Sequence, residues 1–502
     1  MGTQVGGMQD VFIQLKWKTI KGVERAVKAI EKVDGRVLHA YVPSIIVASV
    51  PSDQVARLVG RGGIVSATTE PLETTPTVAD RQVGGAVRPL GFAIAAWNEH
   101  LSADRRLAAL ASPELNKSWG EIERRPPDPP AEVMAQLRHL ERQYAPAMSA
   151  ALLGAPNMNI PVLVGRIAVG LIYVDSTVAQ YQITDQEKSK VLSETIEGLN
   201  MLSGFEPRAN VQWFYDVSRP KVSMTASQFT EANKDQWEDL WRNAAMGAMG
   251  YSASFNGMNA YISKIKANFK ADWAYAIFVT KYPSHWFAYY WGNHIVMDFA
   301  VDGWGINNFS RVVAHETGHA FGCPDEYSSV NCNCTQLAGR YQIPNGNCET
   351  CASPFVPCLM CANTPAVCDY TRGHLGWNEL ALMSKGTTTL KETWTFDFET
   401  GVEGPPTGAD IWWERVDNTV HFLMPQSGAM LANMGKPNFD AVSLQTLQAQ
   451  PYTANPINGS TNASNQLTPG TVIAVRTNTG RYAKVKIDSY GSDLGITWAT
   501  YK

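Results

Sequence analysis

Two histidines four positions apart, with a glutamate directly after the first, have the spacing of a metal site. On a helix, His315 and His319 lie on one face, one turn apart, and two imidazoles at that spacing can bind one Zn²⁺. Glu316 points about 100° round the helix, so it lies beside the metal and can take a proton from a bound water. Gly322 permits a left-handed turn that ends the helix and can bring Asp325 back as a third ligand. The stretch therefore predicts a catalytic zinc site.

This pattern has a plain alternative, because H-E-x-x-H alone occurs by chance in many proteins. The alternative is a surface helix that carries two solvated histidines. The glycine and the acid at fixed offsets after the second histidine make a chance match much less frequent. We therefore interpret the stretch as a metal site.

The full pattern from His315, H-E-x-x-H-x-x-G-x-x-D, resembles the zinc signature of the metzincin metallopeptidases. In most of these enzymes the third ligand is a histidine six residues after the second, and a smaller set has an aspartate there, as this chain has. The ending Asp325-Glu326-Tyr327 also resembles bacterial peptidases of the immunoglobulin A peptidase type, in which the offset of the acid can differ. Asp325 is therefore the expected third ligand, and Glu326 is the alternative.

The resemblance also implies roles for residues after the zinc helix. Met360, in the stretch Pro-Cys-Leu-Met-Cys-Ala, stands where metzincins have their Met-turn, which puts an apolar floor under the metal. Tyr370 is a candidate for stabilising the oxyanion, as tyrosines do in some relatives, and His374 is an alternative ligand. The implied catalytic fold is a mixed sheet followed by the zinc helix, with substrate adding as a strand at the sheet edge.

All eight cysteines fall in one short, turn-rich segment. Two interpretations compete. Pairs of C-x-x-C can bind a structural zinc, whereas an even set in a loop-rich segment can form four disulfides. We favour disulfides, because a segment with so few apolar residues needs covalent cross-links. The cysteines are Cys323, Cys332, Cys334, Cys348, Cys351, Cys358, Cys361 and Cys368.

The bulk composition is that of an ordinary globular protein with 45% apolar residues and a formal net charge of −4. No basic stretch suggests a nucleic-acid partner, and no apolar run is long enough to span a membrane. The N-terminus lacks the pattern of a signal peptide. Disulfides would nevertheless favour a secreted or cell-surface protein.

The 502 residues predict an α+β protein of several domains. Residues 1–72 alternate strand and helix patterns and resemble the ferredoxin-like propeptides found ahead of subtilisins; a small docking or dimerisation domain is the alternative. Residues 73–158 are a proline-containing linker with helical stretches, suited to an activation region. Residues 159–385 form the metzincin-like peptidase domain, and residues 386–502, with short strands between turns, form a C-terminal β-sandwich-like domain.

These features together predict a zinc-dependent endopeptidase that acts on protein or peptide substrates and is made as a latent precursor. Glu316 is the expected general base. The alternative is a non-catalytic, zinc-stabilised binding protein that acts through its β domain. The acidic residue beside the ligands favours the enzyme, since a structural zinc site has no use for it. Acidic loops could also hold Ca²⁺, although they contain no defined calcium motif. The sequence does not determine the cleavage specificity or the oligomeric state.

Overall fold

The computed structural model describes most of the chain, in ranges 7–73, 90–101, 115–119, 159–301, 304–379, 382–405, 407–439 and 442–501. Most of the predicted activation region, 73–158, lies outside these residues. The chain divides into two compact units, Met1–Cys334 with Gly346–Val367, and Thr335–Asn345 with Cys368–Lys502. The two units together contain several sheets and several helices, which is consistent with the predicted α+β multidomain class. No helix in the described ranges is long and apolar enough to cross a membrane.

The N-terminal part of the first unit follows the predicted order of strands and helices. Strand β1 pairs antiparallel with β3 and β4, and β3 pairs antiparallel with β2, so the order is β4-β1-β3-β2. Helix α1 begins after Thr19, whose side chain accepts a hydrogen bond from the Gly22 amide. The elements are β1 (Met8–Leu15), α1 (Ile20–Glu31), β2 (Arg36–Tyr41), β3 (Ile45–Pro51), α2 (Val55–Leu58) and β4 (Ile64–Thr68).

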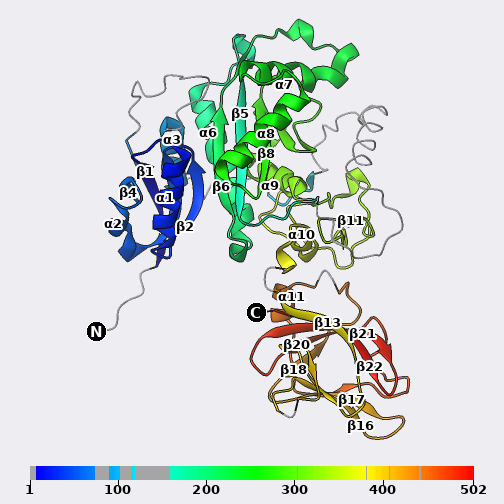
Figure 1. The fold of residues 1–502 in the computed structure, drawn as a ribbon. Helices are drawn as coiled ribbons and strands as arrows, with labels where there is room; N and C mark the ends of the chain where they lie inside the picture. Colours follow the sequence, from blue (N-terminus) through cyan, green and yellow to red (C-terminus); the bar gives the residue numbers. More distant parts are fainter. Residues whose placement is uncertain are drawn as a thin grey trace. The chain divides into compact units, whose positions relative to one another are not determined.

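The N-terminal strands and the later strands of the first unit form one continuous sheet. The second edge of β2 pairs in parallel with β6, with His39 opposite Trp213 and Tyr41 opposite Tyr215. Figure 1 shows β2, β6, β5 and β8 side by side. The sheet continues through β6 (Gln212–Ser218), β5 (Arg166–Ser176), β8 (Trp273–Thr280), β10 (His294–Asp298) and β9 (Ala288–Trp291), with β7 (Lys221–Val222) beside β5.

Helices cover both faces of this sheet, as a parallel sheet requires. Strand β5 is buried along nearly its whole length, which agrees with its unbroken apolar sequence. Helices α1, α7 and α8 share one core with one face of the sheet. On the other face, α6 packs against both α3 and α9. Their bounds are α3 (Leu90–Leu101), α6 (Asp185–Gly204), α7 (Trp237–Ala248), α8 (Phe255–Phe269) and α9 (Phe309–Ala320).

Helix α9 carries both histidines and has two fixed neighbours. One is α6, where a Cβ on Gly198 would collide with the Ser310 carbonyl, so the helices approach closely there. The other is β9, the last strand of the sheet. Gly292, with a φ of 61°, turns the chain into the hairpin of β9 and β10.

The second unit contains two antiparallel five-stranded sheets that share one core. Residues of both sheets, such as Trp413 and Trp498, meet in it, as in two sheets packed face to face. The orders are β13-β22-β21-β20-β18 and β15-β14-β16-β17-β19. The strands are β13 (Leu382–Leu390), β14 (Thr395–Asp397), β15 (Val402–Glu403), β16 (Ile411–Arg415), β17 (His421–Pro425), β18 (Met430–Asn433), β19 (Ile457–Asn458), β20 (Val472–Arg476), β21 (Tyr482–Tyr490) and β22 (Leu494–Tyr501).

A 3₁₀ turn occupies Trp377–Glu379, and β13 begins at Leu382, where its run of threonines favours a strand. The remaining elements of this unit are β11 (Leu337–Ala338), β12 (Ile343–Pro344), α10 (Asp369–His374) and α11 (Leu444–Gln448).

Acid should destabilise the fold through the β2–β6 junction, because burial keeps His39 neutral there while the unfolded chain binds a proton on the same imidazole. His39 is fully buried, with Nε2 2.6 Å from Asn200 Oδ1 and Nδ1 2.9 Å from the Tyr215 hydroxyl. Burial lowers the pKa of His39 from 6.5 to about 4. Between these values the unfolded chain binds a proton that the folded chain does not. The contribution of His39 to the free energy of unfolding is therefore complete above pH 6.5. It falls by about 3 kcal/mol as the pH drops towards 4.

Urea unfolding of the wild type and of His39→Gln, at about pH 7 and about pH 5, measures this effect. Wild type should lose more free energy of unfolding between the two pH values than the variant, which has no imidazole to protonate. The same loss in both proteins would contradict the assignment to His39.

Candidate metal centre

The centre is built on the buried helix α9. His315 and His319 lie one turn apart on it, with ring centroids 4.7 Å apart and ring planes at 88°. The helix ends at Ala320, and Gly322 takes a φ of 85°, which reverses the chain. That turn returns Asp325 to the two rings, as predicted from the sequence.

Three donor atoms converge at one point. The Nε2 atoms of His315 and His319 are 3.1 Å apart, and Asp325 Oδ1 lies 3.1 Å from the first and 3.2 Å from the second. A tetrahedral ion with bonds of about 2.0 Å requires ligand atoms about 3.3 Å apart. The triangle therefore fits one face of a tetrahedral zinc site, and these residues could hold a metal ion.

Backbone carbonyls orient both imidazoles. His315 Nδ1 lies 3.0 Å from the Leu359 carbonyl, and His319 Nδ1 lies 2.8 Å from the Cys323 carbonyl. A carbonyl only accepts, so each Nδ1 donates and each neutral ring keeps its lone pair on Nε2. The lone pairs then point at the shared centre, which is the arrangement of metal-binding histidines.

Charge at the centre is unbalanced without a cation. Burial opposes the charge on His319, yet Asp325 overcomes it and raises the pKa of His319 to about 9. Burial would raise the pKa of Asp325, but the two imidazoles hold it well below its usual range. The carboxylate thus stays ionised and draws positive charge to the centre, which a metal ion can supply instead of a proton.

Glu316 lies next to the triad without joining it. Its side chain is buried, and the backbone of Tyr290 on β9 donates a hydrogen bond to the carboxylate. Its Oε2 has no hydrogen-bond partner among the described residues. Burial raises the pKa of Glu316, since nearby water no longer stabilises its charge. A buried carboxylate with one idle oxygen can accept a proton from a group that enters the site.

The structure separates the two acids that the sequence left as alternatives. Asp325 faces the imidazoles, whereas Glu326 is fully buried and its Oε2 accepts a hydrogen bond of 2.7 Å from Asn347 Nδ2. The Glu326 amide donates to the Met360 carbonyl at 3.0 Å. Glu326 therefore anchors the returning segment, and Asp325 joins the histidines.

Met360, the residue expected in the Met-turn, lies against helix α9. A Cβ on Gly318 would come within 2.7 Å of the Met360 sulfur, so the side chain lies against the helix between the two histidines. Met360 is fully buried. Tyr370 and His374 lie on α10 in the second compact unit, outside the unit that carries the triad. His374 is buried there, with Nε2 3.0 Å from the Ile343 carbonyl.

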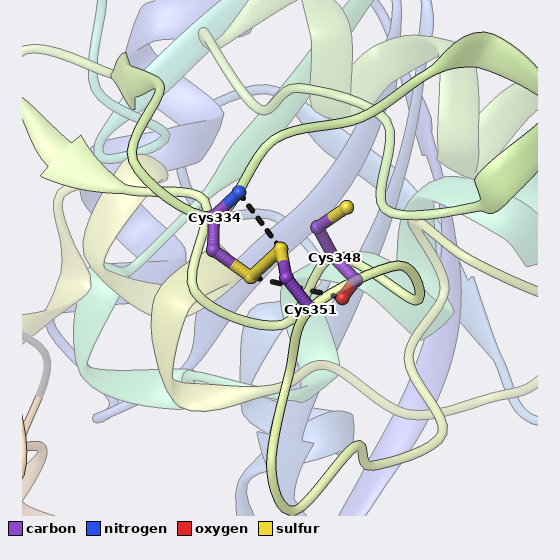
Figure 2. Close-up of side chains that lie close together, drawn as sticks. All are labelled: Cys334, Cys348 and Cys351. Carbon is purple, nitrogen blue, oxygen red and sulfur yellow. Dashed lines mark hydrogen bonds between the residues drawn. A yellow bond between two sulfur atoms is a disulfide. The ribbon is translucent and has the colours of Figure 1, made fainter.

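Two disulfides cross-link the segment after the helix. Cys332 pairs with Cys348 and Cys334 with Cys351, with Cα atoms 5.7 and 6.1 Å apart. Figure 2 shows the Cys334–Cys351 disulfide with Cys348 beside it. These pairs confirm half of the predicted set. The other four cysteines are buried and form no disulfide: Cys323, Cys358, Cys361 and Cys368.

The cross-linked loop supports the segment that carries Asp325. Between the disulfide cysteines, the Glu349 amide donates to the Glu326 carbonyl at 2.8 Å, and the Glu349 carboxylate accepts from the Ser328 amide at 2.7 Å. Asn347 also holds Glu326. The disulfides thus act on the metal centre through these hydrogen bonds.

Two aromatic residues of the site were not found from the sequence. Tyr327 donates a hydrogen bond to Asp325, and burial with the nearby acids raises its pKa. It stood in the quoted Asp-Glu-Tyr ending, so its position was a usable signal. Trp119 lies with its ring centroid 5.2 Å from that of His315. No sequence signal pointed to it, because 196 residues separate them.

The second unit holds a separate cluster of three acidic side chains, of the kind expected if its loops were to bind Ca²⁺. Carboxylate oxygens of Asp397, Glu399 and Asp410 lie within 4.8 Å of one another. Burial raises the pKa of Asp410 to about 7. Two backbone amides, of Phe398 and Asn478, donate to Asp410. Such groups are common without an ion.

Asp325→Ala should lower zinc affinity by at least about 100-fold, because it removes one of three donor atoms. Glu326→Gln is the matched control, since its amide oxygen can still accept from Asn347 and the triad stays complete. Zinc content after dialysis against a weak chelator measures both. Retention of zinc by Asp325→Ala, with loss from Glu326→Gln, would reverse the assignment of the third ligand.

Comparison with known proteins adds no further constraint on this centre. The sequence matches no family model, and no curated protein sequence is significantly similar to it. The interpretation of the centre therefore depends on its donor atoms, their distances and the groups around them.

Proposed function

We propose that the protein is a zinc-dependent endopeptidase. The observation that carries the proposal is the triangle of His315, His319 and Asp325 donor atoms beside the idle, buried oxygen of Glu316. A bare structural zinc site has a closed set of four ligands, whereas a catalytic one has three protein ligands and an open position. Three donors with an adjacent carboxylate match the second kind.

Zinc in such a centre acts as a Lewis acid that makes water nucleophilic near neutral pH and polarises the scissile carbonyl. The residues of this chain do the rest. Glu316 accepts the proton of the attacking water at Oε2 and then delivers it to the leaving amine. The Tyr290 backbone holds the other part of the carboxylate, so the proton acceptor has a fixed direction.

Peptide substrate is proposed to bind along β9. This strand is the last of its sheet, pairs antiparallel with β10, and carries Tyr290 next to Glu316. An extended peptide that adds to a sheet edge gains main-chain hydrogen bonds with little dependence on sequence. A scissile bond held there would lie close to the proton acceptor. The parallel sheet, its antiparallel edge strand and the histidine helix together support a metzincin-like catalytic fold.

A ferredoxin-like N-terminal module is part of the same proposal. The order β4-β1-β3-β2, with all neighbours antiparallel, supports it. We also propose synthesis as a latent precursor with a cleavage between this module and the catalytic part. Because β2 pairs with β6 in one sheet, the module would stay bound after such a cleavage.

A secreted or cell-surface location fits the two disulfides, because such bonds persist in oxidising compartments. The rival function is a non-catalytic binding protein in which zinc only stabilises the fold. The idle Oε2 of Glu316 favours the enzyme, since burying an unsatisfied carboxylate oxygen destabilises a protein that has no use for it.

Glu316→Gln should keep one zinc per chain and lose peptidase activity by about 10²- to 10⁴-fold, because the amide cannot accept the proton. Hydrolysis of a fluorogenic casein, together with elemental analysis of the same samples, gives both quantities. Full activity in the variant would exclude the mechanism. Wild type that binds zinc but stays inactive, even after limited proteolysis of residues 73–158, would favour the binding protein.

A further inference from the structure

We propose that Trp119 is a positioning residue of the metal centre, and that the short segment 115–119 belongs permanently to the active enzyme. The inference rests on the metal centre of the proposed function. The segment comes before the predicted catalytic domain in the chain, within the predicted activation region 73–158. The segment nevertheless contacts residue 359, residues 361–363 and the His315 ring, all of which belong to the metal centre or support it.

The segment runs antiparallel to the Met-turn. The Asn116 amide donates to the Asn363 carbonyl at 2.8 Å, and the Asn363 amide donates to the Lys117 carbonyl at 2.9 Å. The Trp119 amide donates to the Cys361 carbonyl at 3.1 Å. Ser118 and Ala362 form the bridge between them. Each of the two segments therefore both donates and accepts backbone hydrogen bonds, as neighbouring antiparallel strands do.

Trp119 reaches from this pairing to the zinc ligand. Its side chain is 8% exposed, and its Nε1 donates to the Leu359 carbonyl at 2.7 Å. The same carbonyl accepts from His315 Nδ1 at 3.0 Å. The indole ring lies 5.2 Å from the His315 ring at 56°, and 4.7 Å from the ring of Trp304. Trp119 thus holds both the imidazole and the carbonyl that orients it.

Asn363 links the segment to the zinc helix by a second route. Asn363 Nδ2 donates to Asn308 Oδ1 at 3.0 Å, directly before α9, and Arg311 Nη1 on α9 donates to Asn363 Oδ1 at 3.4 Å. Asn308 Nδ2 in turn donates to the Trp304 carbonyl at 2.7 Å. Removal of residues 115–119 would therefore remove the contacts with the His315 ring and the Leu359 carbonyl, and the backbone pairing of Asn363, which itself holds the beginning of α9.

Groups that orient a metal ligand set the affinity for the metal. Trp119→Ala should therefore bind zinc about 10- to 100-fold more weakly than wild type. Trp119→Phe keeps a ring against His315 and loses only the hydrogen bond to Leu359, so about 5-fold weaker binding is expected. Titration of each protein against a chromophoric zinc chelator measures the affinities without any peptidase assay.

Trp97→Ala and Trp97→Phe are matched controls. Trp97 is also buried, donates its Nε1 to a backbone carbonyl, that of Glu70, at 3.0 Å, and has its ring 5.7 Å from the ring of His100. It makes the same kinds of contact in the N-terminal part, away from the metal ligands. Its variants should lose stability but keep the zinc affinity of wild type. If Trp119→Ala does not fold, the comparison of the two phenylalanine variants decides.

A second readout depends on the short distance between the rings. Cu²⁺ bound at the centre should quench the fluorescence of Trp119, so the emission lost on Cu²⁺ loading should be smaller in Trp119→Phe than in Trp97→Phe.

Equal zinc affinities for wild type, Trp119→Phe and Trp97→Phe would overturn the proposal. Unchanged affinity with higher peptidase activity in Trp119→Ala would also overturn it, because the segment would then be an inhibitory plug. If wild type has no peptidase activity but the variants have the predicted zinc affinities, only the proposed peptidase function is excluded.

Discussion

The ionised carboxylate of Asp325 between two imidazoles is the interaction on which the rest of the site depends. Buried charge is costly unless it is paired, and here Asp325 Oδ1 lies 3.1 Å from His315 Nε2 and 3.2 Å from His319 Nε2, where a proton or a metal ion can balance the charge. The returning turn at Gly322, the anchored Glu326 and the cross-linked loop all hold one carboxylate in place. Each of these features is local, and each fixes the position of the Asp325 carboxylate beside the two imidazoles.

Backbone carbonyls provide most of the orientation at this centre. The Leu359 carbonyl accepts from His315 and the Cys323 carbonyl accepts from His319, so the rings are oriented by the backbone before Met360 and by the backbone just after helix α9. A carbonyl has the same chemistry in every residue, which makes the arrangement tolerant of sequence change at those positions. It also makes the arrangement dependent on the path of the backbone, and that path is fixed by the disulfides and by the segment at Trp119.

Because one sheet is continuous from β4 to β9, the N-terminal region is a structural part of the first unit rather than a separate module covering it. A propeptide that covers a cleft can leave after cleavage, because it contributes little to the core beneath it. Strands β1 to β4 instead extend the sheet that carries β9, and His39 is fully buried where β2 pairs with β6. A parallel pairing between β2 and β6 buries backbone groups that would otherwise need water or another partner. The N-terminal strands are thus a structural part of the sheet that carries β9.

The sequence by itself determined the local parts of this protein. The spacing of His315 and His319, the turn at Gly322 and the return of Asp325 follow from helix geometry and from glycine's access to positive φ. The order of strands and helices in residues 8–68 and the β-rich second unit also follow from local patterns. These features involve residues close together in the chain, so periodicity and turn chemistry are sufficient to find them.

Tertiary structure decided the rest. Only the fold brought Trp119 to His315, joined β2 to β6, and chose Asp325 over Glu326 by giving the latter a partner in Asn347. Cysteine pairing was equally out of reach, because spacing does not fix which sulfur atoms meet. Contacts of this kind join residues far apart in the sequence, and burial, packing and hydrogen-bond satisfaction select among them only when the whole chain is folded.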